Sequence, residues 1–224
     1  MLNVETAARK ARIATIAVLG AGHVGSAFAR VAVEAGYRVS IAASGDPQKI
    51  ALIARVLTPG AEPRWAADAI ADADAVILAI PLHRFDAVDP ALLAGKIVVD
   101  VMNYWPPIDG VQQLFEDPIL STSEIVQRRL AESRVVKSFN HIGYHELESE
   151  RRPVGSRTRQ ALGVAGDDPF AVDSVAEVVE RIGYDAIRLA GLGAGRVLQP
   201  GGPVFGALLD TREFEGHVRL DDAA

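Results

Sequence analysis

The chain has 224 residues, 49% of them hydrophobic, and a formal net charge of −6. This acidic balance lacks the basic footprint of a nucleic-acid-binding protein, so we expect no nucleic-acid partner. The sequence contains no cysteine, which excludes disulfides, zinc sites with thiolate ligands and a cysteine nucleophile. The length allows one large domain, or a nucleotide-binding domain with a small appendage.

The first residues do not resemble a targeting signal. Residues 1–12 are polar and charged and lack the apolar core of a signal peptide, so we predict a disordered N-terminus there. No stretch of the sequence approaches the roughly 18 consecutive apolar residues of a membrane span. We expect a soluble, cytoplasmic protein with no membrane partner.

Residues 13–25 join a strand pattern to a glycine fingerprint. Ile13 to Leu19 is almost wholly apolar, and Gly-Ala-Gly-His-Val-Gly follows. The first glycine permits a sharp turn out of the strand, the second leaves room for a pyrophosphate, and the third allows the next helix to pack closely. That helix is predicted over about Val24 to Ala35, and its N-terminus offers free amides to phosphates. The spacing predicts a dinucleotide site that includes Gly20, Gly22, His23, Val24 and Gly25.

A second strand, Tyr37 to Ala42, completes a βαβ unit and precedes the residues that select the nucleotide. In NAD-binding units an acidic residue about twenty positions after the first glycine binds the ribose 2′-hydroxyl, but residues 41–44 contain no carboxylate. The hydroxyl of Ser44 is able to donate to a 2′-phosphate, and Lys49 adds positive charge. The pattern favours NADP over NAD. Two alternatives stay open, in which Ser44 only caps the next helix or Asp46 binds the ribose of NAD.

Strands and helices continue to alternate along the chain. Helices are predicted over Pro47–Leu57 and Trp65–Ala71, within Leu82–Leu93 and over Ser121–Glu132, with strands at Ala75–Ile80, Lys96–Val101 and Arg134–Phe139 and a loop at residues 58–63. Ser121 or Ser123 is the expected cap of the fourth of these helices. This alternation indicates a doubly wound, mostly parallel sheet.

Beyond residue 139 the pattern changes. Residues 148–159 are charged and loop-like, and a strand at Gln160–Ala165, a helix at Pro169–Ile182 and a strand at Tyr184–Leu189 follow. These elements form either a smaller C-terminal lobe or an extension of the same sheet. We predict an α/β fold of the Rossmann type, with a dinucleotide-binding domain at residues 13–140 and a smaller C-terminal α/β lobe at residues 141–224.

Residues that follow the strands are candidate site residues, because ligands of open α/β sheets bind at the carboxyl ends of the strands. Ile80 and Pro81 end the third apolar strand and Asn103 follows the fourth, and we expect all three at the nucleotide. Trp105, with Tyr104 beside it, offers a stacking wall for a flat ring. The alternative is that both rings anchor the Pro-Pro turn that comes next.

Three further segments carry a family resemblance. Residues 99–103 (Val-Asp-Val-Met-Asn), 136–140 (Val-Lys-Ser-Phe-Asn) and 193–201, together with the fingerprint, resemble the NADPH-dependent F420 reductase family, the F420:NADP oxidoreductases. The resemblance runs from residue 13 to about residue 206. It implies hydride transfer between nicotinamide C4 of NADP and C5 of a deazaflavin such as coenzyme F420, across a cleft between the two lobes. We also expect a homodimer.

The resemblance implies roles for particular residues. The family's turn after the second strand is a Ser followed by an Arg, with a Lys farther on; Ser44 and Lys49 match, whereas Gly45 replaces the Arg. The loop after the fifth strand lies against the deazaflavin in this family, which together with Trp105 gives a second site of Asn140, His141, Ile142 and Trp105. No catalytic acid or base is assigned, because such a transfer needs stacking and orientation above all.

Two other functions fit the same residues. One is an NADPH-dependent reductase of a small carbonyl or imine substrate, and the other is a non-catalytic dinucleotide-binding sensor. A flat open cleft favours the deazaflavin, a closed pocket around Tyr104 and Trp105 favours a small substrate, and a blocked nicotinamide site favours a sensor.

Two features near the strand ends have competing explanations. His141 and His145 have the i, i+4 spacing of metal ligands, but no third ligand lies near them in the sequence, so we expect no metal. A histidine packed under its own loop explains His141 equally well. Arg196 either reaches an anionic group of the partner ligand or caps a helix C-terminus.

Overall fold

The structure, a computed structural model, describes residues 13–117 and 119–221. The disordered segment predicted at residues 1–12 lies outside the described residues.

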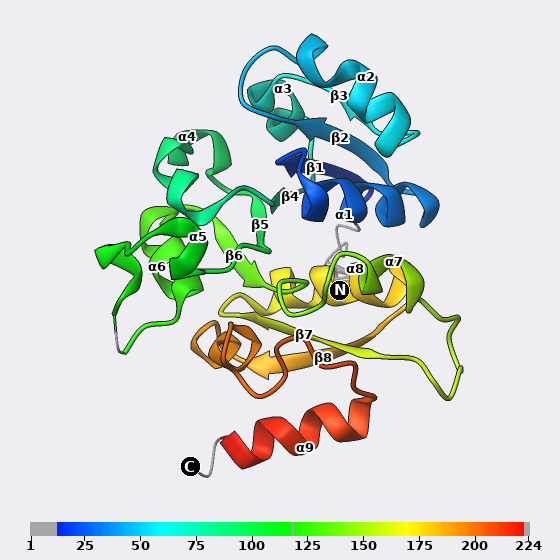
Figure 1. Cartoon of the computed structure of the whole chain (residues 1–224), viewed down its shortest axis with the longest axis vertical. Helices are drawn as coiled ribbons and strands as arrows, with labels where there is room; N and C mark the ends of the chain where they lie inside the picture. Colours follow the sequence, from blue (N-terminus) through cyan, green and yellow to red (C-terminus); the bar gives the residue numbers. More distant parts are fainter. Residues whose placement is uncertain (1–12, 118, 222–224) are drawn as a thin grey trace, which may run out of the picture.

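Eight strands of the described chain form one sheet in the order β3-β2-β1-β4-β5-β6-β7-β8 (Figure 1). Neighbouring strands are parallel except β6 and β7, which are antiparallel. The strands are β1 (Thr15–Leu19), β2 (Arg38–Ala42), β3 (Glu62–Pro63), β4 (Ala75–Leu78), β5 (Ile97–Asp100), β6 (Arg134–Lys137), β7 (Ala161–Gly166) and β8 (Asp185–Ala190). The predicted Rossmann-type, doubly wound fold is confirmed.

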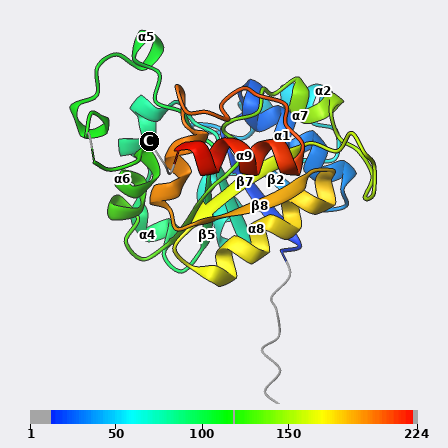
Figure 2. The same ribbon diagram turned by 90° about the horizontal axis from the view of Figure 1, so that it is seen from below.

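Helices cover both faces of this sheet, because alternate strand residues are buried on opposite sides. One face packs against α1 (His23–Glu34), α2 (Gln48–Leu57), α7 (Glu146–Ser149) and α8 (Pro169–Ile182), and the other against α3 (Ala66–Ala71), α4 (Pro90–Leu93), α6 (Thr122–Arg129) and the 3-10 turn η1 (Leu82–Ala87). The helix α5 (Pro106–Asp109) lies on a segment that projects from the sheet (Figure 2). The remaining elements are η2 (Gln113–Phe115), η3 (Gly193–Leu198) and α9 (Thr211–Asp221).

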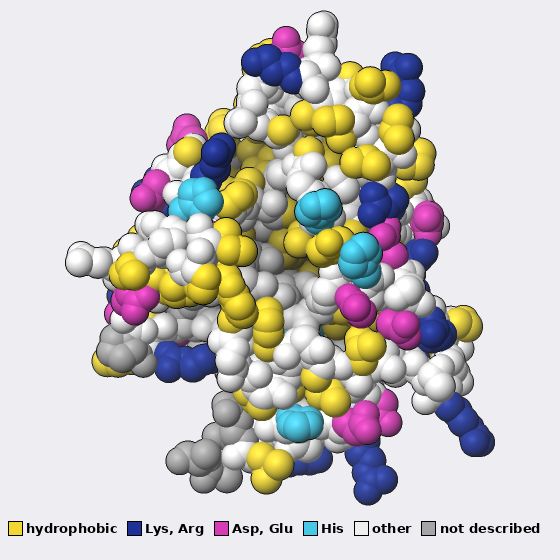
Figure 3. Space-filling view, viewed as in Figure 1, with side chains coloured by type: hydrophobic (Ala, Val, Ile, Leu, Met, Phe, Trp, Pro, Cys, Tyr) yellow, Lys and Arg dark blue, Asp and Glu magenta, His cyan; other side chains and the backbone are white. Residues whose placement is uncertain are grey.

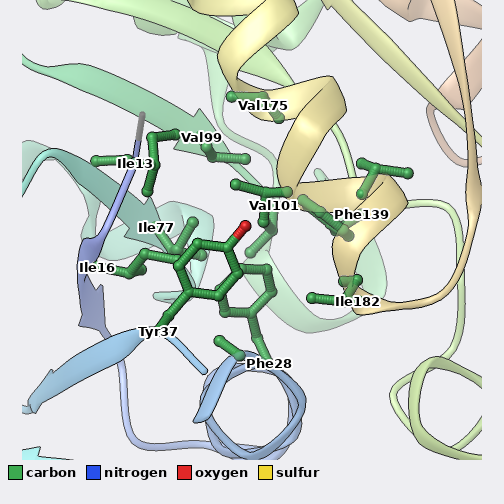
Figure 4. Packing of buried hydrophobic residues seen from close by; sticks show 14 of the residues in the cluster. Ile13, Ile16, Phe28, Tyr37, Ile77, Val99, Val101, Phe139, Val175 and Ile182 are labelled. Atoms are coloured by element: carbon green, nitrogen blue, oxygen red, sulfur yellow. The ribbon is translucent and has the colours of Figure 1, made fainter. Parts of the chain in front are cut away.

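The larger core lies between the sheet and the helices α1 and α8. Phe28 of α1 packs edge-on against Phe139, with a centroid separation of 5.1 Å, and strand residues such as Ile77 surround them (Figure 4). Val175 and Ile182 of α8 belong to the same cluster. The sheet and its core therefore continue past residue 140, as expected if the C-terminal elements extend the same sheet. The division into two domains at residue 140 stays a prediction.

Two of the elements that were not predicted lie in or beside segments expected to be loops. The strand β3 interrupts the loop expected at residues 58–63, and α7 begins just before the loop expected at residues 148–159. A two-residue edge strand that contains Pro63 carries no alternation for sequence analysis to detect. The short α7 is held by tertiary contacts, since Leu147 is buried and Tyr184 Oη donates to the carbonyl oxygens of Glu146 and Leu147.

Helix boundaries and caps otherwise follow the sequence pattern. Ser121 caps α6 in a reciprocal capping box with Glu124, as one of the two expected caps. The helix then ends at Arg129 rather than at Glu132, because Leu130 leaves the helical conformation and is buried.

Candidate functional site

Two glycines of the fingerprint are required by close packing of the backbone. Gly20 has a φ of +120°, and a Cβ there would lie 2.2 Å from the carbonyl oxygen of Ala79 at the end of β4. A Cβ at Gly25 would lie 1.9 Å from the carbonyl oxygen of Gly20. Neither position accepts a side chain, so the turn after β1 is held between β4 and helix α1.

The middle glycine differs, because the space around it is open. A Cβ at Gly22 would meet no atom within 4 Å, and the residue is exposed. Gly22 is the N-cap of α1, no side chain caps this helix, and its first turn holds no acidic residue. The first amides of the helix have no acceptor within it and carry its positive end. This free space beside an uncapped helix fits a pyrophosphate group.

The fingerprint lies at the point where the sheet changes direction. β1 stands between β2 and β4, so the chain crosses from one side of β1 to the other after β3, and such a point opens a crevice at the carboxyl ends of the strands. Figure 3, in the orientation of Figure 1, shows this face hollowed near its centre, with hydrophobic side chains along the rim. The predicted residues Ile80, Pro81, Asn103 and Asn140 follow β4, β5 and β6 at this edge.

Ser44 and Lys49 lie near the carboxyl end of β2, and both are exposed. In the described residues Ser44 makes no hydrogen bond, whereas the carboxylate of Asp46 accepts from the amide of Gln48 at 2.8 Å. The N-cap residue of α2 is Pro47, and the carboxylate that accepts from its first turn is that of Asp46, which contradicts the alternative of Ser44 as a cap. Gly45, between them, has a φ of +92° and open space around it.

Asn103 and Asn140 join the loops that follow β5 and β6. Asn103 Nδ2 donates to the carbonyl oxygen of Asn140 at 2.8 Å, and Asn140 Nδ2 donates to Asn103 Oδ1 at 3.0 Å. Asn140 Nδ2 also donates to the carbonyl oxygen of Leu198 at 2.5 Å. Asn140 is buried and Asn103 is half-buried. Phe139, just before this pair, has a φ of 62°, a conformation rare for a large side chain and concentrated at functional sites.

A buried ion pair lies directly beneath these loops. Lys137 Nζ is 3.3 Å from Asp100 Oδ2, and the two side chains are 0% and 1% exposed. Asp100 accepts from Ser123 Oγ at 2.6 Å and from the amide of Met102 at 2.9 Å, while Lys137 donates to the carbonyl oxygen of Met102 at 2.5 Å. The N–H and the C=O of Met102 are thus both hydrogen-bonded to the ion pair. These bonds fix the position of the backbone at the next residue, Asn103. Burial lowers the pKa of Lys137, and Asp100 opposes that shift.

His141 is buried rather than exposed to the hollow. It is 2% exposed, its Nε2 accepts from the amide of Gly163 at 3.1 Å, and its ring packs edge-on against Phe214. Burial, and next the positive charge of Lys137, lower its pKa to about 3. The alternative of a histidine packed under its loop therefore describes its side chain, while Ile142 beside it is half-buried.

This buried histidine predicts a pH dependence of stability. Its pKa is about 3 in the folded chain against an ordinary value of 6.5, so between these values the unfolded chain binds one proton more. The free energy of unfolding then falls as the pH falls from 6.5 towards 3, by about 1.4 kcal/mol per pH unit from this group. Urea unfolding of the wild type and of His141→Gln at pH 7, 6, 5 and 4 measures it. We expect the variant to show the shallower decline; parallel declines would contradict the assignment.

The two aromatic residues after β5, Tyr104 and Trp105, make different contacts. Tyr104 Oη donates to Glu116 Oε1 at 2.5 Å and accepts from the amide of Gln112 at 3.0 Å, so Tyr104 ties together the projecting segment. Trp105 is 44% exposed and stacks on Phe205, with centroids 6.5 Å apart and planes 23° apart. Phe205 was not predicted, because it meets Trp105 only through a contact between segments 100 residues apart in the sequence.

A second unpredicted pair joins the loops after β4 and β5. His83 Nδ1 lies 2.9 Å from Asp109 Oδ1, whose side chain is 5% exposed, while that of His83 is 35% exposed. The other oxygen of Asp109 accepts from the amide of Trp105 at 2.8 Å. The carboxylate therefore orients both an imidazole and the start of helix α5.

The metal spacing noted for His141 and His145 is not used in the fold. His145 precedes the short α7 and its ring contacts Tyr144, which in turn stacks on His23 at 5.1 Å. His141 faces the core instead. Within the described ranges, no three His, Asp or Glu side chains are grouped to hold a metal ion.

Arg196 lies in η3 and donates to the carbonyl oxygen of Ile119, so it joins η3 to the projecting segment. A cavity of about 180 Å³ between these segments is lined by Arg196, Tyr104, Thr122 and Gln199, among others. A larger cavity of about 510 Å³ is lined by Ile13 and Tyr37, which precede β1 and β2. It lies at the opposite edge of the sheet from the candidate site residues.

Known proteins give the following comparisons. Residues 15–104 match the family model described as NADP oxidoreductase, coenzyme F420-dependent. A hypothetical protein from Sinorhizobium meliloti is 28% identical, with a TM-score of 0.73 over 88% of this chain and 95% of its own. A proposed F420-dependent NADP reductase from Arthrobacter sp. FB24 is also 28% identical, with a TM-score of 0.66 over 82% of this chain and 87% of its own.

More distant structures share the fold alone. The 3-hydroxyisobutyrate dehydrogenase of Mycobacterium tuberculosis is 19% identical, with a TM-score of 0.57 over 82% of this chain and 57% of its own.

The search of curated proteins gave no match. Among the described helices, none combines the length and the apolar character needed to cross a membrane. Residues 15–104 thus match the model of the same family that the sequence resemblance named, the coenzyme F420-dependent NADP oxidoreductases.

Proposed function

We propose that this NAD(P)-dependent oxidoreductase transfers hydride between NADP(H) and a deazaflavin such as coenzyme F420. The observation that carries the proposal is the open space at Gly22 beside the uncapped N-terminus of α1. At the same edge of the sheet lie an exposed serine and lysine after β2, and Trp105 after β5, which stacks on Phe205. The match to the family and the name of the Arthrobacter neighbour support the deazaflavin as the partner.

The dinucleotide would bind across the carboxyl edge of the sheet. Gly20, Gly22 and the first amides of α1, at His23, Val24 and Gly25, would hold the pyrophosphate. Ser44 and Lys49 would bind the 2′-phosphate. The nicotinamide half would then extend to the other side of β1, to the residues Ile80, Pro81 and Asn103 after β4 and β5.

The second ring would bind beside the aromatic pair. Trp105 is partly exposed and Phe205 holds it nearly parallel, so the pair offers an apolar edge to a planar ring. The amide of Gly206 donates to the carbonyl oxygen of His141, which ties the Phe205 segment to the loop of Asn140 and Ile142. When bound, NADPH supplies hydride from nicotinamide C4 to C5 of the deazaflavin, and a solvent proton completes the reduced ring. The chain's own part is to stack and orient the two rings.

A direct assay tests this proposal. Purified protein is mixed with NADPH or NADH and oxidised F420, and the nicotinamide and deazaflavin absorbances are followed together. The proposal predicts that both absorbances fall in equal molar amounts. Tight binding of NADPH without any reduction of F420 would contradict it.

Nucleotide preference gives a separate prediction. Ser44→Asp places a carboxylate where the 2′-phosphate would bind, so we expect the variant to lose affinity for NADPH and to keep its affinity for NADH. Two like charges in such contact cost several kcal/mol in partial burial, and screening at this exposed site reduces the effect to about tenfold. Fluorescence titration with both nucleotides measures it, with Ser44→Ala as the uncharged control. Equal losses for both nucleotides would show that Ser44 is not at the 2′-phosphate.

One observation favours a second candidate, a reductase of a small carbonyl or imine. Such a substrate needs a proton as well as hydride, and an imidazole oriented by a buried carboxylate is a common proton donor. His83 and Asp109 form such a pair at the ends of the loops after β4 and β5. His83→Gln separates the two functions: reduction of a cyclic imine by NADPH would be lost in this variant, whereas F420 reduction would stay at the wild-type rate.

A further inference from the structure

The side-chain amides of Asn103 and Asn140 have fixed orientations, because each has a backbone partner of one kind only. A backbone carbonyl accepts and never donates, so the contact of Asn140 with Leu198 O identifies its Nδ2. In the same way the carbonyl oxygen of Asn140 identifies Nδ2 of Asn103. Asn140 Oδ1 therefore points away from Asn103 and towards His141 Nδ1, at 3.4 Å.

The imidazole of His141 is fixed by the same logic. The backbone amide of Gly163 donates and never accepts, so His141 Nε2, 3.1 Å away, carries no proton. In the neutral ring the proton is then on Nδ1, where it faces the oxygen of Asn140. Three independent backbone groups, on β7, η3 and the loop after β6, thus give one consistent set of donors and acceptors.

We propose that His141 is a positioning residue, which holds Asn140 and through it Asn103, so that Asn103 presents one amide N–H to the carboxamide oxygen of the nicotinamide. Asn103 Nδ2 has two hydrogens, and its contacts in the described residues use one of them, on the carbonyl oxygen of Asn140. Asn103 is half-buried at the carboxyl end of β5. A neutral carbonyl oxygen is the group that such an amide donor recognises.

The identification of the nicotinamide as the group that Asn103 binds rests on the proposed function. With the adenosine half on the β2 side of the fingerprint, the nicotinamide half lies over β4 and β5, where Asn103 is. The buried ion pair supports the same arrangement from below, because Lys137 and Asp100 hold the backbone of Met102 just before Asn103. His141 itself touches no ligand in this arrangement and acts through the two asparagines.

A double-mutant cycle on NADPH binding tests the proposal. Asn103→Ala and His141→Leu are each expected to weaken NADPH binding by about two- to tenfold, the range of one hydrogen bond. The double variant should bind no more weakly than the weaker single variant, since both changes remove the same contact. His141→Gln keeps an acceptor for Gly163 and a donor for Asn140, so this variant should bind NADPH as the wild type does, unlike His141→Leu. Losses that multiply in the double variant would overturn the proposal.

A second measurement does not depend on any ligand. Nitrogen-15 NMR of the wild type, with His141 assigned by comparison with His141→Gln, reports which ring nitrogen is protonated. We expect a proton on Nδ1 and none on Nε2 at pH 7; the opposite tautomer or a charged ring would overturn the proposal even if His141→Leu fails to fold. Because neither measurement uses a hydride acceptor, a failure of F420 reduction leaves both informative. A wild type that binds no NADPH would overturn the proposed function, and with it the role of Asn103.

Discussion

Gly22→Ala is expected to abolish most NADPH binding while the protein stays as stable as the wild type. A Cβ at this position meets no protein atom within 4 Å, so the folded chain has room for it. The same space is where the pyrophosphate would approach the backbone. Forcing an extra methyl group into a close contact costs about 1–3 kcal/mol, which corresponds to roughly a five- to 150-fold loss of affinity. Titration with NADPH and thermal unfolding of the same samples measure the two effects.

Two other glycines serve as matched controls. Gly25→Ala puts a Cβ 1.9 Å from the backbone oxygen of Gly20, so this variant should lose stability as well as binding. Gly216, in helix α9, also has open space around it, and Gly216→Ala should change neither affinity nor the NADPH dependence of unfolding. If Gly22→Ala binds NADPH as tightly as the wild type does, the pyrophosphate does not lie at the fingerprint.

Lys137→Met is expected to be the most destabilising single change in this region. It leaves the carboxylate of Asp100, 1% exposed, without its cation. Removing one partner of a buried ion pair typically costs about 3–5 kcal/mol, a large part of the roughly 5–15 kcal/mol that stabilises a whole domain. The variant also loses the donor to the carbonyl oxygen of Met102, so the loop that carries Asn103 becomes less ordered. Urea unfolding monitored by circular dichroism measures the loss.

The neutral pair distinguishes a buried charge from a general packing defect. In Lys137→Met with Asp100→Asn, the amide still accepts from Met102 N–H and donates to Ser123, and no charge stays buried. We expect this double variant to recover most of the lost stability. Lys49→Met, at an exposed lysine, is the control and should change stability by less than about 0.5 kcal/mol. A loss as small as this in Lys137→Met would contradict the role given to the ion pair.

The parts of the fold that sequence analysis predicted are those with local causes. The strands β1 and β4 are apolar runs that end at turn residues. Helix α8 begins at a Pro after its N-cap Asp168 and ends before its C-cap Gly183. The fingerprint was recognisable because each glycine answers a separate local requirement, and the structure confirms close packing at Gly20 and Gly25. Such signals depend on neighbours in the sequence, so no knowledge of the tertiary structure is needed to read them.

The features that sequence analysis missed arise from contacts between distant segments. Trp105 was a candidate, but its partner Phe205 follows η3 and becomes visible only when the two loops meet. The pair of His83 and Asp109 likewise joins separate loops. For His141 the sequence left two roles open, a contact with the deazaflavin or packing under its own loop. The antiparallel return of β7, which brings the amide of Gly163 to its ring, gives the second.

The fate of a deuterium label tests most directly the central claim, which is that hydride passes from the nicotinamide ring to the deazaflavin ring. NADPH labelled with deuterium at C4, on one face and then on the other, is mixed with the protein and oxidised F420 in ordinary water, and the reduced deazaflavin is analysed by mass spectrometry and NMR. Two rings held in one fixed stack predict that deuterium from one face only appears at C5 of the deazaflavin. Deuterium from neither face at C5, or from both faces equally, would contradict that arrangement.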